Sequence, residues 1–343
     1  MSEANPVIDS SISPQGAAQL QQLSKGLAVK PRTLWGDVWR RFRKHKLAIV
    51  GAVILTVLTL AVTLGPAIYV PYRVAQAETV GFPIAPQNQN LRGVMDHLNF
   101  IATLQGPSAA NPFGTDELGR DLLARSLYGG QISLLVGFVA MLIAVSLGTL
   151  IGAVAGFVGG MLDQVLMRVV DLFLSLPVLP LLLLTVYLFR DPVTRALGQE
   201  TGIFIIVVTM IGALSWMQTS RIVRAAFLSI KEKEFVEAAH ALGVRSGSIM
   251  FRHILPNSLS PIIVAATIGI GAAIITESTL SFLGVGFPPD TPTWGRLVTD
   301  GYQYLQVAPH LALIPGFLIF VTVLSINFVG DGLRDALDPR SRL

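Results

Sequence analysis

Hydrophobic residues form six long runs along the chain, and polar or charged segments separate each run from the next. A helix that crosses a bilayer needs about 20 mostly apolar residues. The third run is short and carries Pro177 and Pro180, so a kink is expected there. The pattern predicts an all-α polytopic membrane protein with six transmembrane helices. The six runs cover residues 47–70, 132–158, 172–189, 203–220, 261–285 and 311–331.

The composition agrees with a chain that lies mostly in a lipid bilayer. Of its 343 residues, 52% are hydrophobic and 13% are charged, whereas soluble domains contain about 25% charged residues. The chain has no cysteine, which excludes disulfides and thiolate chemistry. The net charge is +4, but the basic residues are distributed as membrane topology requires, so no nucleic-acid partner is predicted. Residues 1–32 are rich in Ser, Gln, Ala and Pro and are predicted to form a disordered cytoplasmic tail.

The placement of Lys and Arg predicts that both termini are cytoplasmic. Eight basic residues precede Leu47, and six more lie in the loop 221–257 between the fourth and fifth runs. Cytoplasmic loops of membrane proteins carry an excess of such residues. The segment 71–131 is then an external loop, and the segments near 190–202 and 286–310 are external as well.

Residues 33–46 predict an amphipathic helix at the membrane interface. Trp35, Trp39 and Phe42 fall at i, i+4 and i+7, which is one face of a helix, and basic residues occupy the other positions. A helix of this kind lies along the lipid headgroups. A simple basic flank of the first span remains the alternative.

Four glycines recur at every fourth position at the end of the second run. They are Gly148, Gly152, Gly156 and Gly160. Small residues at this spacing form a ridge that lets a second helix approach closely. The ridge therefore predicts tight helix packing and no chemistry.

The loop 221–257 is the most distinctive polar segment between two apolar runs. Residues 231–242 contain neither Pro nor Gly, and Glu and Ala are common, so a helix is predicted. Phe235, Ala239 and Leu242 fall on one face of that helix at i, i+4 and i+7. Such a helix could dock a soluble partner, and the alternative is a helix that rests on the membrane surface.

The end of this helix and the rest of the loop carry two further signals. Gly243 can supply the left-handed residue that ends a helix. A second short helix is predicted over residues 246–254. Pro256 disfavours helical geometry at Leu255 and predicts a boundary before the fifth span.

Glu277 lies within the apolar residues 265–282, where a carboxylate is costly and faces protein or water. One interpretation makes it a residue of the transport pathway or a helix contact in the outer half of the fifth span. The other makes it a hydrogen-bonded structural carboxylate.

Motifs for catalysis or metal binding are absent from the sequence. The chain has no Gly-x-x-x-x-Gly-Lys-Ser/Thr loop, no His-Glu-x-x-His and no Gly-x-Ser-x-Gly. Its five histidines show no metal-ligand spacing. We therefore predict that the chain is not an enzyme, has no catalytic or metal-binding residues and binds no cofactor of its own.

The loop 221–257 resembles the motif of permease subunits of binding-protein-dependent ABC transporters. Four other segments, 111–121, 280–286, 293–295 and 330–340, resemble the dipeptide, oligopeptide and nickel group of these permeases. The resemblance covers about residues 33–343 and is specific to the second, C-type permease of such systems. The matching loop positions are Glu237, Ala238, Ala239, Gly243, His253, Leu255 and Pro256.

The resemblance implies a type I importer permease fold in a bacterial inner membrane, with residues 132–343 as the permease core. It implies that a second permease completes the pathway, that two ATPase subunits bind ATP and Mg, and that an external substrate-binding protein delivers the solute. The loop 232–257 would contain the helix that couples to the ATPases. The implied coupling residues are Glu237, Ala238, Ala239, Leu242, Gly243, His253, Leu255 and Pro256.

Peptides are the commonest substrates of this group, so import of dipeptides or oligopeptides is favoured. The alternatives are import of nickel or another small solute by the same mechanism, or a self-sufficient secondary transporter. The last would predict several buried charges and paired broken helices, but only Glu277 is clearly within a span.

A compact charged cluster lies in the predicted external loop. We interpret it as a candidate contact for the binding protein, with capping of an external helix as the alternative. The stretch 71–110 departs from the group and carries no assigned role. The cluster consists of Asp116, Glu117, Arg120 and Asp121.

Overall fold

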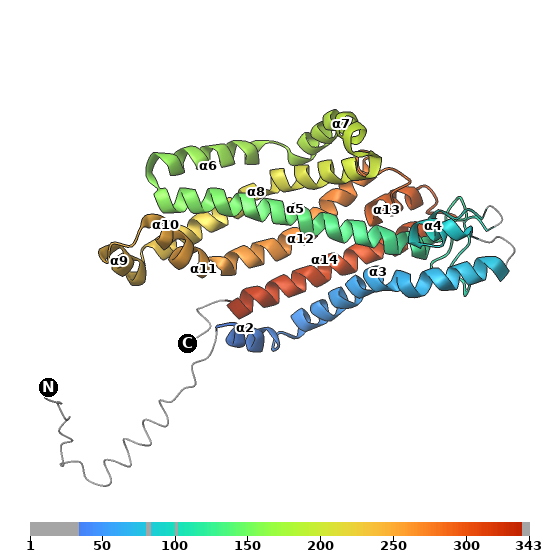
Figure 1. Ribbon diagram of the computed structural model, residues 1–343, viewed down its shortest axis with the longest axis horizontal. Coiled ribbons are helices and arrows are strands. Elements are labelled where there is room, and N and C mark those ends of the chain that lie inside the picture. The colour runs from blue at the N-terminus through green and yellow to red at the C-terminus, as the bar shows by residue number, and fades with distance from the viewer. Residues whose placement is uncertain (1–33, 80–83, 100–101, 338–343) are drawn as a thin grey trace, which may run out of the picture.

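The computed structural model describes residues 34–79, 84–99 and 102–337, and its regular elements in these ranges are helices packed as an elongated bundle (Figure 1). Five of the helices are long and apolar enough to cross a membrane. They are α3 (Lys46–Thr79), α5 (Leu122–Val158), α8 (Gln199–Lys231), α12 (Leu259–Phe282) and α14 (His310–Leu337).

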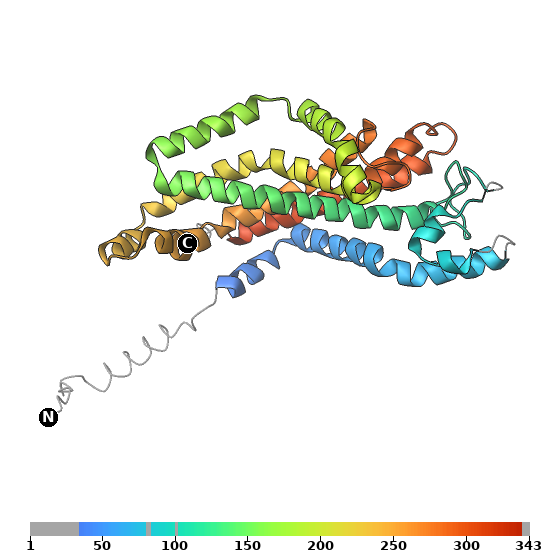
Figure 2. The ribbon, with the colours of Figure 1, turned by 45° about the horizontal axis from the view of Figure 1, so that its top comes forward.

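The third predicted span is not one helix. Its residues are divided between α6 (Gly160–Ser175) and α7 (Val178–Leu197), which meet at an angle of 86° and form a sixth span if the pair is counted as one (Figure 2). Leu176 has extended geometry, because a following proline disfavours the α region. Pro177 therefore causes the predicted kink, whereas Pro180 lies in the first turn of α7, where proline is tolerated.

Two helices extend well beyond their apolar runs, into the predicted external loop 71–131. Helix α3 continues to Thr79, and α5 begins at Leu122. Between them lie the short helices η1 (Pro86–Asn88) and α4 (Leu91–Asp96), and α4 packs on the start of α5. Hydropathy marks where contact with lipid ends, but a helix continues while its backbone hydrogen bonds are satisfied.

The bundle has two different ends. At one end lie α9 (Glu234–Ala241), α10 (Ser246–Ser248), the π-helix η2 (Ile249–Ile254) and α11 (Leu255–Asn257), and we call it the α9 end. Helices α4 and α13 (Trp294–Tyr302) lie at the other, the α13 end (Figure 1).

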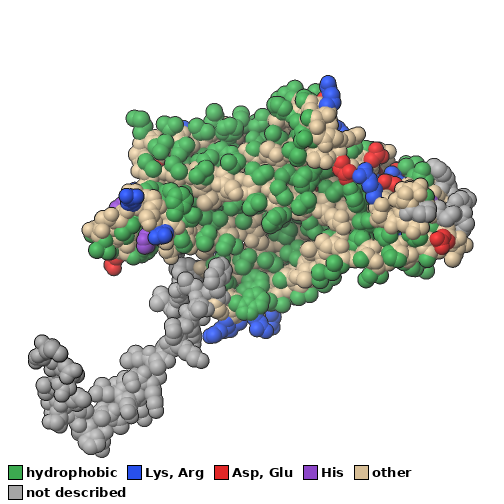
Figure 3. Space-filling model, viewed as in Figure 1, with side chains coloured by type: hydrophobic (Ala, Val, Ile, Leu, Met, Phe, Trp, Pro, Cys, Tyr) green, Lys and Arg blue, Asp and Glu red, His purple; other side chains and the backbone are tan. Residues whose placement is uncertain are grey.

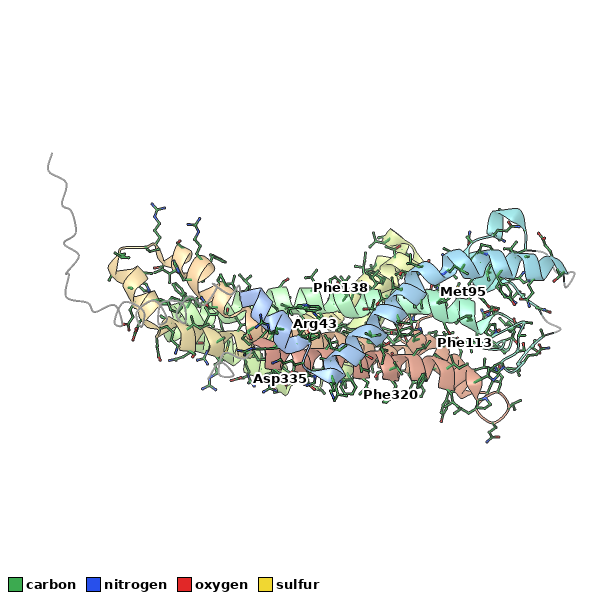
Figure 4. The ribbon with its side chains drawn as sticks, turned by 90° about the horizontal axis from the view of Figure 1, so that it is seen from below. Arg43, Met95, Phe113, Phe138, Phe320 and Asp335 are labelled. Atoms are coloured by element: carbon green, nitrogen blue, oxygen red, sulfur yellow. The ribbon has the colours of Figure 1, made fainter. Side chains whose placement is uncertain are left out.

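Charged side chains gather toward these two ends, and hydrophobic side chains cover the middle (Figure 3). Figure 4 shows Arg43 and Asp335 toward the α9 end and Met95 and Phe113 toward the α13 end. Phe138 and Phe320 lie between them and are 57% and 58% exposed. An exposed apolar middle between two polar ends is the pattern of a multi-pass membrane protein.

Helix α2 (Leu34–Phe42) lies within the predicted interfacial segment 33–46. Its Phe42 packs against Ala48 of α3 and Ala336 of α14, whereas Trp39 remains 59% exposed. The predicted aromatic face therefore does not act as one surface, because Phe42 anchors α2 to the bundle and Trp39 points outward. The predicted tail, 1–32, lies outside the described residues.

The glycine ridge of α5 packs against α8. A Cβ atom at Gly148, Gly152 or Gly156 would lie 2.6, 2.4 or 2.7 Å from atoms of α8, so only glycine permits this approach. The prediction is confirmed for these three residues and is wrong for Gly160. That residue begins α6 with a φ of +61°, and no atom of the described residues lies within 4 Å of the position that its Cβ would occupy.

Candidate functional site

Helix α9 is attached to the ends of two long helices by apolar packing. Its Val236 and Ala239 are buried in a cluster with Phe227 of α8, Ile254 of η2 and Ile262 of α12. Burial of apolar surface stabilises this contact by about 25 cal/mol for each Å² removed from water. The cluster thus joins α9 to α8 and to η2, and it extends to α12.

The other side of α9 is exposed and partly apolar. Phe235 is 45% exposed and Leu242 is 83% exposed. The predicted face of Phe235, Ala239 and Leu242 is thus wrong for Ala239, which packs inward with Val236. The buried stripe runs between Val236 and Ala239, and α9 ends at Ala241, so Leu242 lies beyond the regular helix.

Gly243 ends this helix, as predicted. Its φ is +74°, its N–H donates to the His240 carbonyl at 3.0 Å, and the Val244 N–H donates to the Ala239 carbonyl at 3.1 Å. These two bonds and the left-handed residue form a Schellman motif. Among the described residues, no atom lies within 4 Å of the position that a Gly243 Cβ would occupy, so the turn faces away from the described bundle.

The second predicted helix is present but continues past Pro256. Leu255 has helical geometry, and its N–H donates to the Met250 carbonyl, five residues earlier. The wider π turn accommodates the proline ring that would clash in a regular α-helix. The predicted boundary at Leu255 is therefore wrong, and α12 begins only at Leu259.

The predicted coupling residues occupy one end of the bundle but not one surface. Ala239 is buried, and His253 and Leu255 are half-buried. The exposed members are Glu237, Ala238, Leu242, Gly243 and Pro256.

The α13 end contains a network of buried ion pairs. Arg120 Nε donates to Asp116 Oδ2 at 2.7 Å, and the other Asp116 oxygen accepts from the backbone N–H of Leu118 and Arg120. Arg125 is 1% exposed and lies between Asp116, at 3.6 Å, and Asp300 of α13, at 3.7 Å. Burial raises the pKa of the Asp300 carboxyl above its usual range, and the nearby guanidinium groups oppose this effect.

Asp121 starts helix α5. Its Oδ1 accepts from the Ala124 N–H at 2.9 Å, and its Oδ2 accepts from the Tyr69 hydroxyl at 2.7 Å. The same oxygen lies 3.0 Å from Nε of Arg73. The alternative of a helix cap is thereby confirmed for Asp121.

The four residues predicted as contacts for a binding protein differ in accessibility. Asp116, Arg120 and Asp121 are 5%, 7% and 1% exposed, and their partners lie within the chain. This burial corrects their interpretation as direct contacts. Only the Glu117 side chain, at 28% exposure, remains accessible to a docked protein.

Glu277 is fully buried between two helices. Its Oε1 accepts hydrogen bonds from the hydroxyls of Ser281, at 2.8 Å, and Thr293, at 2.7 Å. Thr293 also caps α13 by accepting from the Arg296 N–H. Glu277 thus joins α12 to the start of α13, which fits the interpretation as a helix contact and hydrogen-bonded structural carboxylate.

A cavity of about 390 Å³ lies at half the length of α5, α8 and α12, beside the bend between α6 and α7. None of the described residues that line it is charged, and Glu277 is not among them. Its polar side chains include Ser215 and Gln218 of α8 and Thr276 of α12.

Sequence reasoning missed this cavity and the buried Arg125 and Asp300. Gln218 and Ser215 within the apolar run 203–220 were the available signal for the cavity. In the part of the chain that the structure describes, no group of three or more His, Cys, Asp or Glu side chains is arranged to hold a metal ion.

Comparison with known families identifies the architecture. Residues 148–343 match the family described as "Binding-protein-dependent transport system inner membrane component". The chain belongs to this family. Residues 33–93 match the N-terminal TM domain of oligopeptide transport permease C. The predicted family is confirmed, and the chain is a multi-pass permease subunit of the inner membrane.

Three curated relatives align with nearly the whole permease. The dipeptide transport system permease protein DppC of Alkalihalophilus pseudofirmus is 39% identical over 92% of each chain. The oligopeptide transport system permease protein OppC of Haemophilus influenzae is 38% identical, also over 92% of each chain. The glutathione transport system permease protein GsiD of Escherichia coli is 37% identical over 91% of this chain and 93% of its own.

A solved structure shares the fold. The inward-facing MetNI methionine ABC transporter contains a chain that matches with a TM-score of 0.50 and 21% identity, over 63% of this permease and 96% of that chain. The predicted fold of an ABC importer permease is therefore confirmed.

Proposed function

We propose that this permease is the C-type membrane subunit of an ATP-driven importer of dipeptides or oligopeptides. It forms the pathway together with a second, different permease. Two ATPase subunits, which hold ATP and Mg, bind at the α9 end, and an external binding protein delivers the peptide at the α13 end. The names of the relatives support the substrate class, because dipeptides, oligopeptides and glutathione all contain peptide bonds.

The observation that carries this proposal is the exposed apolar tip of α9. Leu242 is 83% exposed on the turn after α9, and Phe235, seven residues earlier on the same face, is 45% exposed; exposed apolar side chains that lie together mark a contact with another protein. Beneath it, Val236 and Ala239 pack in one apolar cluster with Phe227 of α8, and the same cluster extends to Ile262 of α12. A partner that grips the tip therefore acts on two membrane helices.

The same two helices line the cavity at the middle of the bundle. Closure of the ATPase dimer would displace α9, and α8 and α12 would move with it as rigid bodies. ATP supplies the energy through its preference for the closed dimer. Through this movement, ATP binding at the α9 end would change the side of the membrane from which the cavity is accessible.

The side on which the ATPases bind follows from charge. Arg245 and Arg252 are exposed beside α9, and Arg40, Arg43 and Lys44 are exposed at the same end. An excess of basic residues favours the cytoplasmic side. The α9 end is accordingly cytoplasmic, together with the α2 segment and the end of α14.

The test of assembly is purification of the tagged permease after co-expression with the products of neighbouring genes, followed by determination of the intact mass. The expected complex holds one copy of this permease, one different permease and two ATPase subunits. A stable monomer or a homo-oligomer without ATPase would contradict the proposal and favour a self-sufficient transporter.

A variant at the turn tests the site of coupling within this complex. Gly243→Asp places a charge beside the apolar tip, and we expect it to reduce co-purification of the ATPases and peptide-stimulated ATP hydrolysis at least about tenfold. Gly243→Asn is the matched control, because Asn has the same shape and also tolerates positive φ. Wild-type association with Gly243→Asp would contradict coupling through this turn.

A further inference from the structure

We infer that the cavity between α5, α8 and α12 is a charge-neutral binding site for the peptide in transit, and that Gln218 holds the peptide backbone there. This inference rests on the proposed import of peptides. It adds a site within the membrane and a reason why the permease accepts peptides of either charge.

The position and size of the cavity fit a short peptide. The lining residues of α5, α8 and α12 lie at the middle of each helix, which is the depth at which secondary transporters also bind their substrates. The volume of about 390 Å³ lies within the range of small-molecule sites. Leu174 and Val178, on the two sides of the α6–α7 bend, form one wall.

The polar groups in the cavity match a peptide bond. Gln218 and Ser215 are exposed, and their side chains have no hydrogen-bond partner among the described residues. A peptide unit offers one N–H and one C=O, and a Gln side chain offers both an acceptor and a donor. The Thr276 hydroxyl donates to the Ala272 carbonyl at 2.8 Å, so its oxygen remains able to accept.

Lipid is a poor occupant of this cavity. An amide and a hydroxyl without partners are costly in hydrocarbon, at about 4–8 kcal/mol for each group in a solvent that cannot form hydrogen bonds. A peptide backbone would satisfy both Gln218 and Ser215. A helix of the second permease is the remaining competitor, and the labelling experiment below distinguishes it.

The absence of charged side chains from the lining explains tolerance of peptide charge. A fixed charge at the centre of the membrane would attract peptides of one sign and repel those of the other, in a medium where screening is weak. A neutral lining accepts both signs and leaves selection to the binding protein.

The first test introduces a charge at Gln218 in the complete importer, reconstituted in vesicles with its binding protein. We expect Gln218→Lys to slow import of Lys-Ala-Ala about tenfold relative to Glu-Ala-Ala, and Gln218→Glu to do the reverse. Gln164→Lys on α6 is the matched control, because Gln164 is exposed but does not line the cavity. It should leave the ratio of the two rates unchanged.

The second test does not need a charged variant to assemble. Because the chain has no native cysteine, Ser215→Cys introduces a single thiol into the cavity. We expect a small cationic thiosulfonate reagent to modify it in the purified complex, and trialanine to slow that modification during turnover.

The outcomes separate the two claims. If the wild-type complex imports none of Lys-Ala-Ala, Glu-Ala-Ala and trialanine, the proposed function is refuted. Normal import together with an unchanged rate ratio in both Gln218 variants would overturn the inference alone. A Ser215→Cys thiol that never reacts would also overturn it, since a partner helix then fills the cavity.

Discussion

The two ends of the bundle differ in how far their charged side chains are buried and paired. At the α13 end, Asp116, Arg120, Arg125 and Asp121 are buried and paired with one another or with neighbouring helices. At the α9 end, the charged side chains of residues 232–252 are exposed, and the contacts that hold α9 to the bundle are apolar.

This difference indicates different mechanical roles. Buried ion pairs are sensitive to geometry and fix the loop 102–121 against α3, α5 and α13. Apolar packing under α9 holds the helix without directional bonds, and the polar surface remains available to a partner. The α13 end is therefore suited to remain rigid, and the α9 end is suited to bind a partner and to move with it.

The largest expected effect comes from breaking the ionic network at its centre. Asp116→Ala leaves Arg120 and Arg125 without their shared carboxylate, which is expected to cost about 3–5 kcal/mol in the free energy of unfolding. Titration of the purified permease with sodium dodecyl sulfate in mixed micelles measures this loss.

Glu117→Ala is the adjacent control for this substitution. Its side chain is partly exposed and has one ion-pair contact of 3.4 Å, so we expect a change below about 1 kcal/mol. Equal losses for the two variants would show that burial of the network does not stabilise the α13 end.

A smaller loss of stability is expected from a substitution in the close packing of α5 on α8, the two helices that run between the ends of the bundle. Gly152→Ala would place its Cβ 2.4 Å from the Ser220 carbonyl oxygen, and overpacking of this kind costs about 1–3 kcal/mol. The same detergent titration measures it. Gly271→Ala is the control, because its nearest neighbour, a methyl of Val323, lies at an ordinary 3.4 Å. Loss of stability in Gly271→Ala but not in Gly152→Ala would contradict close packing of α5 on α8.

Local chemistry made part of this structure predictable from the sequence. The spacing of Gly148, Gly152 and Gly156 predicted a close helix contact, and Gly243 predicted the end of α9. Pro177 predicted the kink. In each case the backbone requirement of a single residue type determines the outcome within a few residues.

Tertiary packing determined what the sequence left open or predicted wrongly. Ala239 and Phe235 lie near each other on a helical projection, but the cluster under α9 buries only the former. Arg125 and Asp300 are 175 positions apart in the sequence and meet only because α13 returns to the start of α5. The cavity exists because three spans and a bent helix pair meet around it.

The most direct test of the difference between the ends is cross-linking from a single introduced thiol in the purified complex. We expect a short thiol-to-amine cross-linker to join Ala241→Cys, at the exposed end of α9, to an ATPase subunit. Glu117→Cys, at the other end, should instead link to the binding protein or remain unlinked. A cross-link to the ATPase from Glu117→Cys, or its absence from Ala241→Cys in an intact complex, would contradict the account.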